Sequence, residues 1–143
     1  MERIYYEVPS EGTAYLTDVK NGDVRTEGMG YGMMAMLQMN NQTVRRLFSL
    51  LTAALSSDQR HCATGQGFDM LWSWVKLHML HTNRSDPLFG WSAWHAYTNG
   101  TRISDGPAPD GETWFITTLF GAAARWGDGA GCALSRTPTP DAS

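Results

Sequence analysis

The sequence is poor in cysteine, in basic residues and in long apolar runs, and each shortage excludes a class of protein. Its 143 residues hold two cysteines, Cys62 and Cys132, without metal-ligand spacing, which we interpret as free thiols. A formal net charge of -3 leaves no basic surface for nucleic acid. No run approaches the roughly 18 apolar residues of a membrane span. No signal peptide opens the chain, so we expect a cytoplasmic protein, or one secreted from a truncated gene model.

Aromatic residues are plentiful by contrast, with six Trp, five Tyr and five Phe. Aromatic faces stack on sugar rings, but they also fill protein cores. A content of 42% hydrophobic and 17% charged residues is ordinary for one globular domain. The four histidines lack ligand spacing, so we expect no metal and no cofactor.

Three stretches have helical periodicity. The first helix is predicted over about residues 28–39, with Thr26 as N-cap; it is apolar on nearly every side and therefore expected to be buried. The second is predicted over about 68–80, and the third from Pro109-Asp110 to Trp126. Residues 90–97 fit either a short strand or a turn of helix.

A carboxylate, Glu27, stands at the start of the first predicted helix. Gly28, Gly30 and Gly32 follow it, each costing roughly 0.5–1 kcal/mol against alanine in a helix, which indicates a close backbone approach or room for a ligand. The residues alone more often indicate a glutamate that complements the helix dipole. Asp110, before the third helix, is likewise typical of an N-cap.

Three ordered segments resemble glycoside hydrolase family 8, the former cellulase family D. They are Asp23 to Met34 (Asp-Val-Arg-Thr-Glu-Gly-Met-Gly-Tyr-Gly-Met-Met), Phe68 to Trp74 (Phe-Asp-x-Leu-Trp-x-Trp) and Gly106 to Glu112 (Gly-Pro-Ala-Pro-Asp-Gly-Glu). The Arg-Thr-Glu and Pro-Ala-Pro-Asp-Gly-Glu variants are more similar to the reducing-end xylose-releasing exo-oligoxylanases than to the endoglucanases and chitosanases of the family.

The resemblance implies roles for five residues. Glu27 matches the general acid of an inverting glycosidase acting on β-1,4-linked xylo-oligosaccharides. Asp110 matches the aspartate that holds the sugar at the cleavage subsite and helps distort its ring, and Trp94 matches a tryptophan that stacks on a sugar. Arg25 and Tyr31 flank the acid and are expected to orient it or bind hydroxyls. Core packing remains the alternative for Trp94 and Tyr31.

The resemblance also implies an all-α fold, the incomplete N-terminal part of an (α/α)6 barrel over residues 1–127, followed by a disordered tail over 128–143. Residues 44–66 separate two pieces that the family joins directly. They are either an inserted helix or a retained intron, since a valine codon begins with GT and a glutamine codon can be CAG. Sequencing the mature transcript separates the two.

The family's general base comes from a later block, and nothing after Trp126 resembles it, so we expect this chain to be inactive by itself. Its expected partner is an oligosaccharide, with neither nucleic acid nor membrane. The alternatives are a family 8 endoglucanase or chitosanase fragment, and a non-catalytic carbohydrate-binding protein using Trp91, Trp94 and Trp114.

Overall fold

The computed structural model describes residues 3–39 and 67–126. The proposed insertion over residues 44–66 and the predicted tail over 128–143 lie outside the described residues, so both stay predictions. Within the described residues, no helix is long and apolar enough to cross a membrane.

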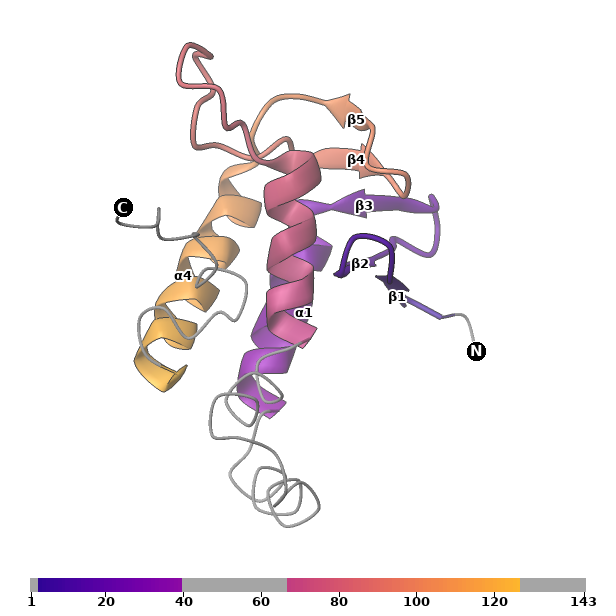
Figure 1. Cartoon of the computed structure of the whole chain (residues 1–143), viewed down its shortest axis with the longest axis vertical. Helices are drawn as coiled ribbons and strands as arrows, with labels where there is room; N and C mark the ends of the chain where they lie inside the picture. Colours follow the sequence, from indigo (N-terminus) through magenta and orange to yellow (C-terminus); the bar gives the residue numbers. More distant parts are fainter. Residues whose placement is uncertain (1–2, 40–66, 127–143) are drawn as a thin grey trace, which may run out of the picture.

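Three packed helices form the body of the described chain (Figure 1). The first, α1, spans Thr26–Met39. The second is α-helical over 67–74 and continues as the π-helix η1 over Val75–Met79. The third, α4, spans Pro109–Trp126. The periodicity of apolar residues therefore predicted all three helices correctly.

Two small antiparallel sheets accompany the helices, so the all-α prediction is wrong for this chain. The strands are β1 Tyr5–Val8 and β2 Thr13–Leu16 in one sheet, and β3 Asp23–Arg25, β4 His95–Tyr97 and β5 Arg102–Ser104 in the other. Each strand has only three or four residues, too few to display an alternating pattern. The pairing of β3 with β4 also joins distant parts of the sequence, which leaves no local signal.

The helices α1 and α4 run parallel and touch along a seam in which each contact includes a glycine. The contacts advance in the same direction on both helices and pair Thr26 with Gly111, Gly30 with Trp114 and Leu37 with Gly121. The helix over 67–79 runs the opposite way, since its Gly67 lies against Met36 and its Leu71 against Gly32. It returns the chain to the end where α1 began, so the N-termini of α1 and α4 lie at the same end (Figure 1).

The core lies between these helices and the sheets. Its largest wholly buried side chains include Met29 and Met33 of α1, Leu71 and Trp74 of the second helix, and Phe115 of α4. At the far end of the seam, the Arg125 guanidinium donates a 2.8 Å hydrogen bond to the carbonyl oxygen of Leu37 in the last turn of α1. Such a bond satisfies a carbonyl that has no partner within its own helix.

The prediction that α1 is buried on nearly every side is wrong, because one face is open. Tyr31 is 54% exposed and Met39 is 76% exposed.

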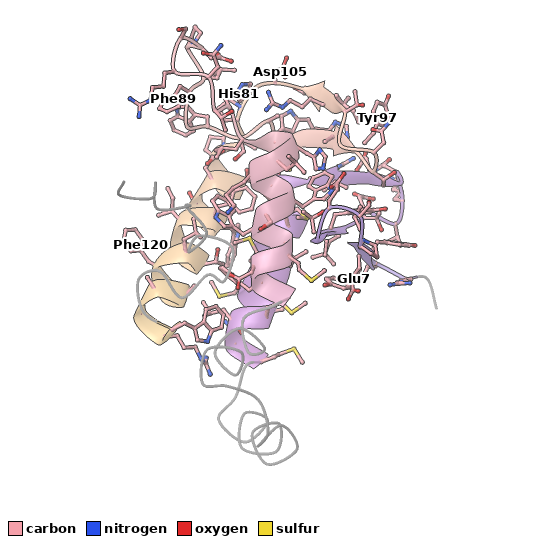
Figure 2. The ribbon with its side chains drawn as sticks, in the orientation of Figure 1. Glu7, His81, Phe89, Tyr97, Asp105 and Phe120 are labelled. Carbon is pink, nitrogen blue, oxygen red and sulfur yellow. The ribbon has the colours of Figure 1, made fainter. Side chains whose placement is uncertain are left out.

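The helix α4 also has exposed apolar side chains, Ile116 and Phe120, and Figure 2 shows Phe120 pointing away from α1. The described part of the chain therefore presents an apolar face on its outer helix, a feature that in other proteins marks a contact surface.

Two glycines of α1 provide a matched test of the seam. A Cβ on Gly30 would lie 2.6 Å from the Cβ of Trp114, whereas one on Gly28 would meet nothing within 4 Å. Gly30→Ala should therefore lower the free energy of unfolding by about 1–3 kcal/mol. Gly28→Ala should raise it by about 0.5–1 kcal/mol, because alanine is the better helix former. Urea unfolding followed by circular dichroism measures both, and shifts of the same sign would contradict the seam.

Candidate active site

The first turns of α1 and α4 meet beside the three-stranded sheet (Figure 1). Thr26 is wholly buried there, and a Cβ on Gly111 would overlap its hydroxyl oxygen. The backbone N–H of Thr26 donates a 3.1 Å hydrogen bond to the carbonyl oxygen of Trp94. The backbone N–H of Trp94 in turn donates to the carbonyl oxygen of Gly106, at 3.0 Å. Three segments that are distant in sequence thus converge on one threonine.

Glu27 and Asp110 lie on either side of this contact, because Glu27 follows Thr26 and Asp110 precedes Gly111. Glu27 is half-buried, and the Thr26 hydroxyl donates to its Oε2 at a long 3.4 Å. Asp110 is exposed. Both carboxylates stand in the first turn of a helix, where the helix dipole favours negative charge. The structure therefore places the two acidic residues singled out by the sequence in first turns that touch through Thr26 and Gly111.

Asp110 is not an N-cap, contrary to the interpretation from pattern alone. Pro109 is the first residue of α4, a position that suits proline because its missing N–H would have no helical partner. The carbonyl oxygen of Ala108 already accepts the backbone N–H of Glu112 at 3.0 Å. Among the hydrogen bonds of the described residues, the side chain of Asp110 makes no such capping bond, and it is exposed in the first turn of α4.

Glu112, by contrast, has a structural partner. Its Oε1 accepts a 2.7 Å hydrogen bond from the backbone N–H of Ser92. This bond attaches the segment before β4 to the first turn of α4. Glu112 thus has a structural role in joining these two segments.

Arg25 is fixed by two aspartates. Its Nε and one terminal nitrogen donate to the two carboxylate oxygens of Asp23 at 3.0 and 3.2 Å, and its other terminal nitrogen lies 3.6 Å from Asp18. Hydrogen bonding to Asp23 raises the pKa of Arg25 above its ordinary value, and the charges of Asp23, Asp18 and Glu27 raise it further. The guanidinium is thus a permanent cation at the start of α1.

Asp23, the centre of this arrangement, was not among the predicted site residues. It is 6% exposed, and it accepts a 2.8 Å hydrogen bond from Nε2 of His95 as well as the two from Arg25. Burial by itself would raise the pKa of Asp23, but the hydrogen bonds from Arg25 and His95 outweigh it and lower that pKa. The only sequence signal was its place in the Asp-Val-Arg-Thr-Glu run, since His95 reaches it through the β3–β4 pairing.

The two aromatic residues expected to bind substrate differ in setting. Trp94 is half-buried; its ring stacks on that of His95, with centroids 4.6 Å apart, and the Arg25 guanidinium carbon lies 5.9 Å from its centroid. Tyr31 lies one helical turn after Glu27, so both occupy the same face of α1. It packs edge-on against Trp114 at 5.0 Å, which confirms packing without excluding contact with a ligand on its open side.

Comparison with known proteins identifies relatives of this chain. Rex8A of Paenibacillus barcinonensis, a reducing-end xylose-releasing exo-oligoxylanase, is 42% identical over 128 residues, covering 89% of this chain and 27% of the relative. The exo-oligoxylanase of Bifidobacterium adolescentis is 39% identical over 125 residues, covering 87% and 26%. This chain is a homologue of the reducing-end xylose-releasing exo-oligoxylanases. The resemblance to this branch of glycoside hydrolase family 8 is thus confirmed.

Solved structures of the exo-oligoxylanases superpose on the described fold. Rex8A from Paenibacillus barcinonensis complexed with xylose has a TM-score of 0.67 at 39% identity, covering 89% of this chain and 27% of that structure. A mutant exo-oligoxylanase complexed with xylobiose has a TM-score of 0.67 at 38% identity, with the same coverage. No family model matches the chain. The chain therefore spans about a quarter of these exo-oligoxylanases, which are (α/α)6 barrels.

The pKa of Asp23 predicts how stability depends on acid. A folded-state pKa below the ordinary value of about 3.9 means that the unfolded chain binds the proton more readily. The stabilisation is complete above about pH 4 and is lost as pH falls through the folded-state pKa. Asp23→Asn should therefore destabilise the chain by about 1–3 kcal/mol at neutral pH and flatten the loss of stability in acid. Urea unfolding at several pH values measures both effects.

Asp69 provides a control, because its pKa is shifted in the opposite direction from that of Asp23. Burial raises the pKa of Asp69, although the nearby Lys76 partly offsets it. Its contribution is therefore most favourable below about pH 4 and falls as pH rises through the folded-state pKa. Asp69→Asn should raise the free energy of unfolding at neutral pH. If Asp23→Asn and Asp69→Asn change stability alike across this range, the assignment of Asp23 as a paired, ionised carboxylate is wrong.

Proposed function

We propose that this chain carries the general-acid half of a hydrolase site for β-1,4-linked xylo-oligosaccharides. The observation that carries the proposal is the contact of Thr26 with Gly111, which gathers Glu27, Asp110 and the Trp94 segment at one end of the helices. The exo-oligoxylanase relatives support the substrate class, since their structures include complexes with xylobiose and an arabinofuranosyl-xylotetraose. They favour xylan oligosaccharides over the endoglucanase and chitosanase alternatives.

The chemistry assigned to Glu27 is proton donation. In an inverting glycosidase a carboxylic acid protonates the leaving oxygen as the bond between C1 and that oxygen breaks. A water attacks C1 from the opposite face and loses its proton to a carboxylate that stands about 6.5–9.5 Å from the acid. We assign the first role to Glu27, and to Asp110 the holding and distortion of the sugar ring at the cleavage point.

The remaining residues bind and orient. Trp94 offers an indole face for stacking on a pyranose, a contact that combines apolar area with a fixed geometry. Arg25, held by Asp23, presents a cation near Glu27. Its guanidinium N–H groups that do not donate to Asp23 can donate to sugar hydroxyls. Tyr31, on the same face of α1 as Glu27, adds an exposed ring and a phenolic hydroxyl.

A general base is not assigned to any described residue. We propose that this role belongs to a carboxylate outside these 143 residues, so that the chain alone binds oligosaccharide without hydrolysing it. The second candidate function, a non-catalytic carbohydrate-binding protein, is favoured by one observation: Trp91 is 48% exposed and stands near Trp94 in the sequence. The hydrolase site uses Trp94 without Trp91, whereas the alternative uses Trp91, Trp94 and Trp114 together.

Titration calorimetry with xylotriose tests the site. The wild-type chain should bind xylotriose and should bind cellotriose or chitotriose less tightly. Trp94→Ala should weaken binding at least about tenfold, a loss of about 1.4 kcal/mol, whereas the matched Trp91→Ala should change it less than about twofold. Glu27→Gln should bind nearly as well as the wild type. A loss of affinity in Trp91→Ala as large as that in Trp94→Ala would favour the carbohydrate-binding alternative, which uses both tryptophans.

Analysis of reaction products tests the proposal that the chain alone does not hydrolyse oligosaccharide. The wild-type chain incubated with xylotriose should release no xylose above the level of a no-protein control. Release of xylose that Glu27→Gln abolishes would show that the 143 residues already contain a working base. Failure of the wild-type chain to bind any of the three trisaccharides would contradict the proposed site altogether.

A further inference from the structure

Asp23 joins Arg25, which the proposed site uses, to His95, the neighbour of Trp94. Asp23 and Arg25 are two residues apart on β3, so their side chains lie on the same face of the sheet. Arg25 and His95 are direct partners in the β3–β4 register, which places His95 on that face as well. The buried carboxylate of Asp23 can therefore accept both guanidinium hydrogens and the imidazole hydrogen at once, as the distances show.

His95 carries the effect of this carboxylate to Trp94. A carboxylate oxygen only accepts, so the Nε2 of His95 must bear the hydrogen, and the orientation of the imidazole plane follows from that bond. The same imidazole lies against the indole of Trp94 with an interplanar angle of 29°. The imidazole thereby covers part of the indole surface and restrains the orientation of the indole plane.

We propose that Asp23 is a positioning residue that fixes Arg25 directly and the indole plane of Trp94 through His95. The inference rests on the proposed function, because it concerns the same sugar site. A ring held in place before binding loses little freedom when the sugar arrives, which strengthens binding without any added contact. The competing explanation is that Asp23 only holds β3 to β4.

A second histidine–aspartate pair supplies a matched control. Nδ1 of His81 lies 3.0 Å from the carboxylate of Asp86, and its Nε2 donates to the carbonyl oxygen of Asp105 at 3.0 Å. Figure 2 shows His81 and Asp105 together at the base of the loop that carries Phe89. Asp86→Asn therefore removes the carboxylate partner of a histidine outside the proposed sugar site, although Asp86 is more exposed than Asp23.

The experiment compares Asp23→Asn with Asp86→Asn in the 143-residue chain. Asp23→Asn should weaken xylotriose binding at least about tenfold in calorimetry, whereas Asp86→Asn should stay within about twofold of the wild type. Acrylamide quenching of Trp94, obtained by subtracting the emission of Trp94→Phe, should rise in Asp23→Asn and not in Asp86→Asn. Unchanged affinity and unchanged quenching in a folded Asp23→Asn would overturn the proposal.

Two variants of His95 decide the question if Asp23→Asn does not fold. His95→Phe keeps a ring against Trp94 but cannot donate to Asp23, so it should lose about tenfold in affinity, as His95→Ala should. Affinity retained within about threefold in His95→Phe would overturn the proposal, because the bond to Asp23 would then be dispensable. If the wild-type chain binds no xylotriose, the proposed function fails instead, and the quenching of Trp94 in these variants still decides whether the carboxylate of Asp23 positions the indole.

Discussion

The candidate active site depends on one contact between helices, in which a glycine lets Thr26 of α1 lie against the backbone of α4. Gly111 has no Cβ, and the wholly buried Thr26 occupies the space that a Cβ would need. Any larger residue at position 111 would separate the first turns of α1 and α4 and move Glu27 away from Asp110. The amide of Thr26 is bonded to the segment that carries Trp94, so the same residue also sets the distance from the acid to the indole. Gly30, Gly32 and Gly111 therefore allow a close approach, whereas Gly28 does not.

Much of this was predictable from the sequence, and the rest was not for physical reasons. Apolar residues repeat along α1, the 67–79 helix and α4, and periodicity found all three. Of the strands, only β4 lies in a stretch, residues 90–97, for which the sequence offered a strand as one alternative. The strand Asp23–Arg25 could not be predicted, because three residues show no alternation and its partner is far away in the sequence. The role of Asp23 depends on the same pairing, so it could not be predicted before the register was known. The open face of α1 at Tyr31 reflects which neighbours cover a helix, a property that composition does not contain.

Charge and packing have separate tasks in the site. The seam between α1 and α4 sets where the two acidic residues stand, and it uses only small and apolar groups. The cluster of Asp23, Arg25 and His95 sets how the cation and the indole are oriented, and it does so through hydrogen bonds to a buried carboxylate. A paired buried carboxylate of this kind is costly to disturb, because removing one partner leaves the others unsatisfied. The exposed Ile116 and Phe120 belong to neither task and lie on the outer side of α4.

The central claim is that sugar binds where the first turns of α1 and α4 meet. Amide chemical-shift mapping of the chain titrated with xylobiose tests it most directly. The account predicts that the largest shifts cluster at residues 25–28, 94–95 and 110–112. Shifts confined to the loop over 82–91 or to the exposed face of α4 around Phe120 would contradict it.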